Sequence, residues 1–443
     1  MGSKDTSVPS VPATAKQGND PDDPRTWSWV EPSIWTERML AALGNEVEGG
    51  KWYALMDKVY ASRTLWAAWQ RVARNRGAAG VDRVSIKRFE ANAACYLLEL
   101  EEALRDGSYR PAEVRRVYIP KGKGARPLGV PTVKDRIVQT ALKLVLEPIY
   151  EKEFLPVSYG FRPKRGCKDA LREVDRWLKA GYTWVVDADV ASYFDTIPHA
   201  RLLACVKEKV SDGQVLQLVQ RFLDQDILDG MDRWTPIAGT PQGAVLSPLL
   251  SNLYLHSLDV RMTTAGRTIV RYADDFVILC QSQEEAEAAL AEVAAWTAQH
   301  GLALHPDKTH VGNCTDAGHG FDFLGYRFDG GHRYVRRKSL QVLKDKLRQL
   351  TGRTRSGSMK EIIAELNPIL KGWFGYFQHA RGSNFRTIDG FVRRRLRAVL
   401  RKREKRPGFG RTQSDHRRWP NAFFAVHGLF TFHEAHALAS QSR

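Results

Sequence analysis

The chain has neither paired cysteines nor long apolar runs. Its five cysteines lie far apart and include no Cys-x-x-Cys pair, so the sequence supports neither a zinc ribbon nor a disulfide framework. No apolar run approaches the roughly 20 residues that a membrane-spanning helix needs. The first thirty residues are polar and have no apolar stretch of the kind found in secretory signals. We therefore expect a soluble intracellular protein that does not contact a membrane.

Several common catalytic signatures are also missing. The sequence has no Gly-x-Ser-x-Gly elbow, no P-loop lysine motif and no recognisable Ser-His-Asp set. Serine-hydrolase and P-loop nucleotide hydrolase chemistry are therefore not indicated.

Acidic residues are scarce in the C-terminal quarter. From Gly331 to Arg443 there are 26 basic and 7 acidic residues, a net charge of +19, whereas the first 330 residues carry a net charge of −2. A nearly neutral body with a strongly basic appendage is typical of a protein with a polyanionic partner such as nucleic acid. The alternative is a basic face that serves only solubility.

Local patterns predict an α+β body. Residues 1–23 are polar and rich in Ser and Pro, so we expect them to be disordered. A helix is predicted over 136–150 from an apolar stripe. A second helix is predicted to begin after Ser282, which forms a capping box with Glu285, and to end at Gly301. His199 precedes Ala and Leu at a helix start, and we expect it to face solvent.

The candidate carboxylates lie on one predicted strand and in the turn between two others. Residues 184–190 alternate apolar and polar side chains, which places Asp187 and Asp189 on the same face of a strand. Strands over 269–272 and 276–279 flank a tight turn that holds Asp274 and Asp275. Asp187 lies one strand step from Asp189, and we expect its role to be mainly structural.

Carboxylates flanked by Val and Ile are costly to bury unless a cation compensates them. Phosphoryl transfer by two Mg²⁺ ions about 3.5–4 Å apart needs such carboxylates, because magnesium takes few protein ligands, chiefly carboxylates. Asp189 beside Asp274 and Asp275 would meet this need. The alternative is that Asp274 and Asp275 only stabilise a turn.

The order of motifs along the chain resembles that of reverse transcriptases, most closely those encoded by group II introns. The resemblance runs from about residue 70 to the C-terminus and rests on these segments: Arg76-Gly77 with Gly80-Val81-Asp82, Pro120-Lys121 with Arg126-Pro127-Leu128-Gly129-Val130-Pro131, Ser158-Tyr159-Gly160-Phe161-Arg162-Pro163, Asp189-Val190-Ala191-Ser192-Tyr193-Phe194-Asp195, Gly239-Thr240-Pro241-Gln242-Gly243, Arg271-Tyr272-Ala273-Asp274-Asp275, Leu304-His305-Pro306-Asp307-Lys308-Thr309 and Phe321-Asp322-Phe323-Leu324-Gly325-Tyr326. Several motifs in the right order are far more specific than any one of them.

The resemblance implies an RNA-directed DNA polymerase, a nucleotidyltransferase with a right-hand fold. It has fingers and a palm with an antiparallel sheet over residues 51–330, after an N-terminal extension over 1–50. An all-α basic thumb or maturase domain follows over 331–406, and a basic, possibly DNA-binding tail over 407–443. The implied location is the bacterial cytoplasm. Many relatives continue into an endonuclease domain with His and Cys ligands, and we expect none here.

The resemblance also implies roles for particular residues. Asp189, Asp274 and Asp275 are the catalytic carboxylates, and with Val190 they form the site for two Mg²⁺ ions. Phe194 matches the aromatic gate that excludes a ribose 2′-hydroxyl, and ordinary core packing is its alternative role. The residues expected to contact the deoxynucleoside triphosphate are Lys121, Arg126, Phe194, Gln242, Gly243 and Lys308. The loop that carries Lys121 is about one residue shorter than the family pattern, which leaves Lys123 as the alternative to Lys121. Lys308 could equally be a surface lysine.

The segment 367–377 resembles the maturase-specific domain, which implies binding of intron RNA, an RNA–DNA hybrid and target DNA. The expected RNA-binding residues are Lys371, Trp373, Arg393, Arg394, Arg395, Arg397 and Arg401. Packing in a helical core is the alternative for aromatic residues such as Trp373.

Three functions remain open at this stage. The chain is a reverse transcriptase that also assists splicing of its intron RNA, or an RNA-binding splicing cofactor without polymerase activity, or a related reverse transcriptase recruited to defence or CRISPR spacer acquisition. The intact Asp189, Asp274 and Asp275 count against the second, and the maturase-like segment favours the first.

Overall fold

The computed structural model describes residues 27–45, 50–121 and 124–441, and the predicted disordered segment 1–23 lies outside them. Helices and strands alternate, as expected for an α+β protein. Contacts divide the chain into two compact units. The first holds the described residues up to Phe154 together with Phe194–Tyr254, and the second holds Leu155–Tyr193 and the described residues from Leu255 onward. None of the helices in the described ranges is long and apolar enough to cross a membrane.

The first unit contains a four-stranded sheet of order β2-β1-β4-β5. Its strands are β1 (Val114–Lys121), β2 (Gly124–Val130), β4 (Ile227–Asp229) and β5 (Asp232–Trp234). Its helices are α1 (Glu37–Asn45), α2 (Met56–Tyr60), α3 (Ser62–Arg74), α4 (Ile86–Glu90), α5 (Ala93–Arg105), α6 (Val133–Glu153), α9 (His199–Lys207) and α10 (Gly213–Leu223). Helices α8 (Tyr193–Thr196) and α11 (Ser247–Thr264) cross from one unit to the other.

Helix α6 forms the centre of the first unit. It begins at the N-cap Thr132, whose side chain accepts a hydrogen bond from the Asp135 amide. The apolar stripe predicted from the sequence is buried, and the Trp35 indole donates to the Leu144 carbonyl at 3.0 Å. The predicted helix over 136–150 is thus confirmed and extends a few residues at each end.

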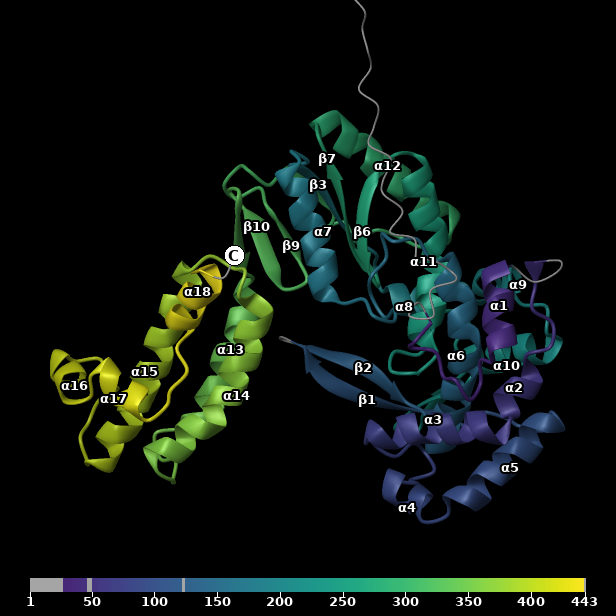
Figure 1. The fold of residues 1–443 in the computed structure, drawn as a ribbon, viewed down its shortest axis with the longest axis horizontal. Coiled ribbons are helices and arrows are strands. Elements are labelled where there is room, and N and C mark those ends of the chain that lie inside the picture. The colour runs from purple at the N-terminus through teal and green to yellow at the C-terminus, as the bar shows by residue number, and fades with distance from the viewer. Residues whose placement is uncertain (1–26, 46–49, 122–123, 442–443) are drawn as a thin grey trace, which may run out of the picture. The chain divides into compact units, whose positions relative to one another are not determined.

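The second unit is built on an antiparallel sheet of order β6-β7-β3-β8 (Figure 1). The strands are β3 (Trp184–Asp189), β6 (Thr268–Tyr272), β7 (Asp275–Cys280) and β8 (His310–Asn313), and helices α7 (Cys167–Lys179) and α12 (Gln283–Gln299) pack against them. All three predicted strands are confirmed. Ser282 caps α12 by accepting from the Glu285 amide, and Gly301 follows the helix with φ +70°.

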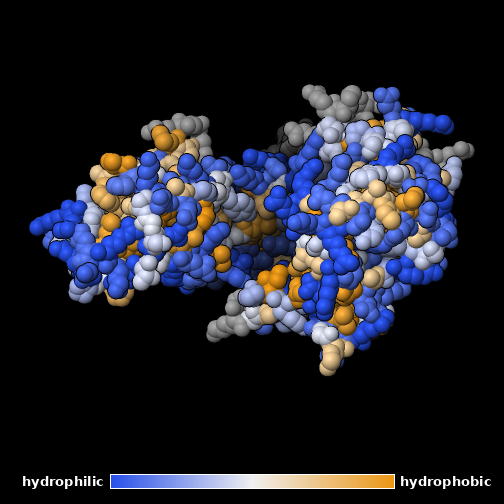
Figure 2. Space-filling model, turned by 90° about the horizontal axis from the view of Figure 1, so that it is seen from below, coloured by the Kyte–Doolittle hydropathy of each residue, from blue (hydrophilic) through white to orange (hydrophobic). Residues whose placement is uncertain are grey.

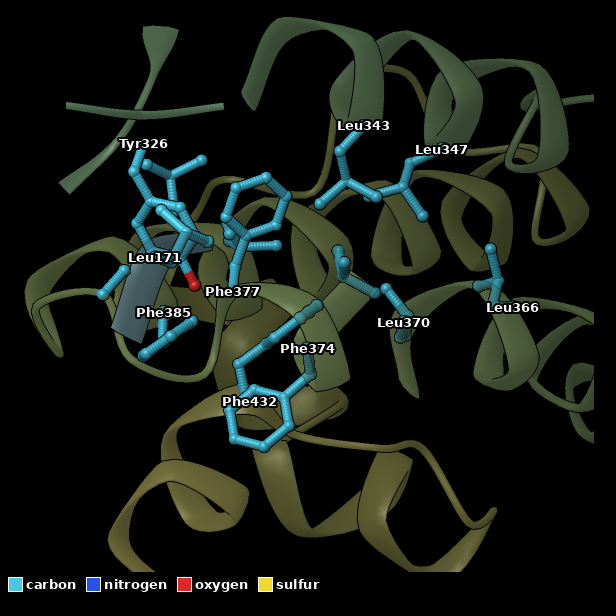
Figure 3. Close-up of a cluster of buried hydrophobic side chains, with 14 of the residues drawn as sticks. Leu171, Tyr326, Leu343, Leu347, Leu366, Leu370, Phe374, Phe377, Phe385 and Phe432 are labelled. Carbon is cyan, nitrogen blue, oxygen red and sulfur yellow. The ribbon is translucent and has the colours of Figure 1, made fainter. Parts of the chain in front are cut away.

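A three-stranded sheet and six helices complete the second unit. The strands are β9 (Phe321–Phe323), β10 (Tyr326–Asp329) and β11 (His332–Val335), and the helices are α13 (Arg337–Leu350), α14 (Met359–Phe377), α15 (Ser383–Arg403), α16 (Gln413–Arg418), α17 (Asn421–Val426) and α18 (Phe432–Gln441). Their core gathers Leu343, Leu366, Phe374, Phe385 and Phe432 (Figure 3). Hydrophilic residues cover most of the face of these helices that is visible in Figure 2. The basic C-terminal quarter therefore folds around an apolar core that continues into residues of α7, β3, β6 and β7.

Candidate active site

The predicted catalytic carboxylates of the second unit gather at one end of its antiparallel sheet. Asp189 is the last residue of β3, and it lies directly opposite Asp275, the first residue of β7. Tyr272 pairs with Asp275 across the β6–β7 hairpin, so Ala273 and Asp274 form a two-residue turn between these strands. Ala273 has a left-handed φ of +59°. Residues other than glycine rarely adopt this conformation.

Repulsion between carboxylates marks this end of the sheet. The pKa of Asp275 is raised to about 7, first because the surrounding protein removes solvation from its carboxylate and then because Asp187, Asp274 and Asp189 repel its charge. The Asp275 side chain nevertheless keeps solvent-exposed surface. Burial also raises the pKa of Asp187 to about 7, against a hydrogen bond from the Asp322 amide that lowers it. Asp187, which the sequence indicated to be mainly structural, is thus part of the charge cluster.

A loop that follows the end of β3 brings Lys308 to the carboxylates. The His305 amide donates to the Asp189 carbonyl at 2.7 Å, and Val190 forms an isolated bridge with Leu304. The Lys308 ammonium then donates to Asp189 Oδ2 at 2.7 Å. Because both side chains are substantially exposed, this ion pair adds little to stability. Its consequence is local, since the lysine neutralises one carboxylate of the cluster.

The donor set fits a hard divalent cation. Within the described ranges, no three His, Cys, Asp or Glu side chains are arranged closely enough to hold a metal ion as they stand. However, carboxylate oxygens are the protein ligands that Mg²⁺ prefers, and a bound cation would relieve the repulsion around Asp275. Asp189, Asp274 and Asp275, together with Asp187, are the residues that could hold it.

The hairpin tip is supported by the segment that follows residue 155. The Arg271 amide donates to the Val157 carbonyl at 2.9 Å, and the Tyr159 amide donates to the Arg271 carbonyl at 2.8 Å. A Cβ atom added to Gly160 would lie 2.3 Å from the Ala273 nitrogen, so glycine is required for this approach. Burial, followed by a hydrogen bond with the Cys167 thiol, raises the pKa of Tyr272 to about 12.

In the first unit, several residues expected to bind nucleotide lie together. Arg126 Nε donates to Gln242 Oε1 at 2.6 Å, and Gln242 Nε2 donates to Asp195 Oδ2 at 3.4 Å. The Thr240 amide donates to the carbonyl of Phe194, a half-buried residue, at 2.6 Å. These contacts join β2, the turn after Phe194 and the segment that holds Gln242.

Gly243 allows this segment to approach β2. It has φ +104°, and an added Cβ atom would lie 2.5 Å from the Gly129 carbonyl oxygen. The Gly129 amide in turn donates to the Gln242 carbonyl at 2.6 Å. The backbone of Lys121 pairs with Gly124 in the β1–β2 hairpin, whereas its side chain and all of Lys123 lie outside the described residues.

His199 differs from its prediction. It is 8% exposed, its Nε2 atom lies 2.7 Å from the Gly239 carbonyl oxygen, and its Nδ1 atom lies 3.4 Å from Asp224 Oδ1. The prediction that His199 faces solvent was wrong, because its ring contacts the Gly239 carbonyl and so links α9 to a distant segment of the chain. That contact between distant segments left no local signal in the sequence.

The basic residues of α15 divide into two groups. Arg397 is 2% exposed, and it donates to the Trp419 carbonyl and to Asn421 Oδ1, each at 2.9 Å. Arg401 pairs with the buried Asp415 and donates to the Pro407 carbonyl. Arg395 donates to the Thr351 carbonyl at 2.7 Å. The structure therefore uses these three guanidinium groups for contacts inside the helical domain.

A second group of cations surrounds Phe391. The cationic groups of Lys344, Arg348 and Arg394 lie 5.9, 5.5 and 5.3 Å from its ring centroid. Burial, followed by the charges of Arg411 and Arg348, lowers the pKa of Arg394. Lys371 is exposed, whereas Trp373 is half-buried and packs on Phe377 and Phe432 at centroid distances of 4.5 and 5.5 Å.

Two regions of the chain match known protein families. Residues 119–328 match the family described as reverse transcriptase (RNA-dependent DNA polymerase). Residues 340–419 match the group II intron, maturase-specific domain. The chain thus contains a reverse transcriptase domain followed by a maturase-specific domain.

Relatives support the same assignment. The chain is 33% identical over 357 residues to Protein YkfC of Escherichia coli (strain K12), covering 71% of this chain and 87% of that protein. It is 38% identical over 211 residues to the group II intron-encoded protein LtrA of Lactococcus lactis subsp. cremoris, covering 47% of this chain and 34% of LtrA. The chain therefore belongs to the reverse transcriptase/maturases of the group II intron type, which are RNA-directed DNA polymerases.

A solved Cas6-RT-Cas1–Cas2 complex is also similar over 54% of this chain and 42% of the matched chain, with 25% identity and a TM-score of 0.36. Likeness at this level does not bear on function.

Proposed function

We propose that this chain copies RNA into DNA at Asp189, Asp274 and Asp275 with two Mg²⁺ ions, and that it also binds a group II intron RNA to assist splicing and mobility. The observation that carries the proposal is the direct opposition of Asp189 and Asp275 at the end of β3 and β7. When bound, the ions would activate the primer hydroxyl and stabilise the leaving oxygen. The backbone of Val190, which follows Asp189, would complete this metal site.

Lys308 has two tasks in this proposal. Without metal it neutralises Asp189 through their 2.7 Å contact. Once a cation takes over that task, the ammonium is available to the phosphates of the incoming nucleotide, because cationic groups stabilise charge in phosphoryl transfer.

We propose that Arg126, Gln242 and Gly243 contact the incoming deoxynucleotide, together with Lys121. The 2.6 Å hydrogen bond from Arg126 to Gln242 fixes the direction of the guanidinium, which leaves its remaining N–H groups to bind phosphate oxygens. Phe194 would lie against the sugar and exclude a 2′-hydroxyl by steric contact.

The proposed architecture is a right hand. Residues 51–330 are its fingers and palm, 331–406 its thumb and maturase domain, and 407–443 a basic tail that contacts target DNA. The preceding residues 1–50 are the N-terminal extension.

For RNA and the RNA–DNA hybrid, we propose that the phosphate backbone is contacted by Lys371, Arg393 and the cations around Phe391. Burial, followed by the charges of Arg411 and Arg348, lowers the pKa of Arg394, and a bound polyanion would offset the positive charge gathered there. Arg395, Arg397, Arg401 and Trp373 are left out of this surface because they make contacts within the domain.

Primer extension on an RNA template tests the proposed reaction and its sugar selectivity together. With Mg²⁺, the protein should extend a DNA primer with deoxynucleotides and discriminate strongly against ribonucleotides. Equal use of the two, or extension on DNA templates alone, would contradict the proposal.

A further inference from the structure

A buried ion pair lies directly behind the β6–β7 hairpin. Arg271 in β6 and Asp259 in α11 have fully buried side chains. Arg271 Nε donates to Asp259 Oδ1 at 2.7 Å, and Arg271 Nη2 donates to Asp259 Oδ2 at 2.5 Å. This two-pronged contact uses the fixed fork of the guanidinium and sets the plane of that group.

The third nitrogen of the fork reaches the turn that carries the catalytic carboxylates. Arg271 Nη1 donates to the Ala273 carbonyl at 2.9 Å. That carbonyl belongs to the peptide that joins Ala273 to Asp274, so the hydrogen bond fixes the orientation of the peptide plane from which Asp274 departs. The same turn contains the left-handed φ of Ala273, which an alanine does not adopt without support from its surroundings.

Stability alone gives a weak reason for such a pair. Removing two charges from water costs several kcal/mol per ion, and a packed apolar pair of similar volume is often at least as stable. A buried pair that also holds a strained turn has a reason to be ionic. We propose that Arg271 is a positioning residue for catalysis, held by Asp259, which fixes the Ala273–Asp274 peptide so that Asp274 and Asp275 face the metal ions.

This inference rests on the proposed metal site and adds a residue that would not contact metal, nucleotide or RNA. Arg271→Lys separates the two tasks of the guanidinium. A lysine keeps the positive charge that Asp259 needs, but a single ammonium cannot hold both carboxylate oxygens and the Ala273 carbonyl in the same geometry.

We expect Arg271→Lys to fold, to bind RNA as wild type does, and to lose at least about tenfold in kcat, since small misplacements of catalytic groups cost about that much or more. The Mg²⁺ concentration for half-maximal primer extension should rise several-fold, while the KM for deoxynucleotide changes by less than about twofold. Asp259→Asn should move the same two quantities in the same direction, and it serves as the test if Arg271→Lys does not fold.

A matched control comes from Asp389, another buried carboxylate of the second unit. It accepts hydrogen bonds from the Phe432 and His433 amides, each at 2.9 Å. Asp389→Asn should lower stability without moving the Mg²⁺ midpoint.

A rescue variant distinguishes positioning from general destabilisation. Glycine adopts the left-handed conformation of residue 273 without strain, so Ala273→Gly in the Arg271→Lys background should recover part of the lost kcat. Wild-type kcat and Mg²⁺ midpoint in both Arg271→Lys and Asp259→Asn would overturn the inference, as would an equal shift in Asp389→Asn. If wild type itself makes no DNA, the proposed function fails and not only the role of Arg271.

Discussion

Asp189 and Asp275 lie directly opposite each other on β3 and β7, and Lys308 pairs with the first of them at 2.7 Å. Like charges on directly opposed strand positions are unfavourable, and burial, followed by the charges of the neighbouring carboxylates, raises the pKa of Asp275 to about 7. A divalent cation bound at this end of the sheet would relieve the repulsion between the carboxylates. This opposition is the observation behind the proposal that these carboxylates form the catalytic centre.

Without metal, Asp187→Asn should stabilise the protein at alkaline pH. Burial raises the pKa of Asp187 to about 7, so the folded state binds its proton more tightly than the unfolded state does. The stability from this group is complete below pH 4 and is lost as the pH rises through 7. Asparagine copies the neutral form. We expect a gain of about 2 kcal/mol at pH 8, discounted for partial exposure, and little change near pH 4.

Urea unfolding with EDTA at the two pH values measures this difference. A loss of stability in Asp187→Asn at both pH values would show that the carboxylate is stabilising in its ionised form, contrary to the expectation.

Gly160→Ala should damage the catalytic hairpin. The added Cβ atom would lie 2.3 Å from the Ala273 nitrogen, and backbone must move to relieve the contact. We expect a loss of about 1–3 kcal/mol in stability and at least about tenfold in kcat. Gly213→Ala is the matched control, because a Cβ atom there meets nothing within 4 Å. Equal activity of the two variants in primer extension would rule out the expected role of Gly160.

Phe194→Val should relax the selection of deoxynucleotides. The residue is half-buried, and its carbonyl accepts from the Thr240 amide at 2.6 Å, a backbone contact that the substitution retains. A smaller side chain leaves room for a 2′-hydroxyl, and steric selection of this size is worth on the order of 10–200-fold. Relative kcat/KM for deoxyribonucleotides and ribonucleotides measures the effect. An unchanged ratio would indicate that Phe194 is only a packing residue.

Two arginine variants, one double and one single, should separate RNA contact from internal packing. Each phosphate-contacting cation contributes about 1 to the slope of log affinity against log salt. Arg348→Gln/Arg394→Gln should therefore reduce that slope by about 2. Arg397→Gln breaks contacts to Trp419 and Asn421, so it should lower the thermal midpoint and leave the slope unchanged. A reduced salt slope in Arg397→Gln, with an unchanged slope in the double variant, would assign RNA contact to Arg397.

The sequence predicted the elements with strong local signals. The alternation around Asp189, the turn between two apolar strands and the cap at Ser282 each specify structure within a few residues, and all are confirmed. The resemblance to reverse transcriptases rested on the order of several motifs along the chain, which does not depend on the number of residues between them.

Contacts between distant segments were not predictable in this way. The bond from Arg271 to Asp259 spans twelve residues and a change of element, and the burial of His199 depends on Gly239. In α15 the charge pattern alone could not separate the internal Arg397 from Arg394 beside Phe391. One local signal was available, since an arginine within the apolar strand β6 requires a buried partner.

Primer extension on an RNA template, with RNA binding measured in parallel, tests most directly whether this carboxylate cluster is the catalytic centre of a reverse transcriptase. Wild type should synthesise DNA with Mg²⁺. Asp274→Asn/Asp275→Asn removes the metal-directed charge at nearly constant volume, so it should abolish synthesis and leave RNA binding intact. DNA synthesis that persists in the double variant, or a folded wild type that binds RNA tightly and makes no DNA, would contradict the assignment.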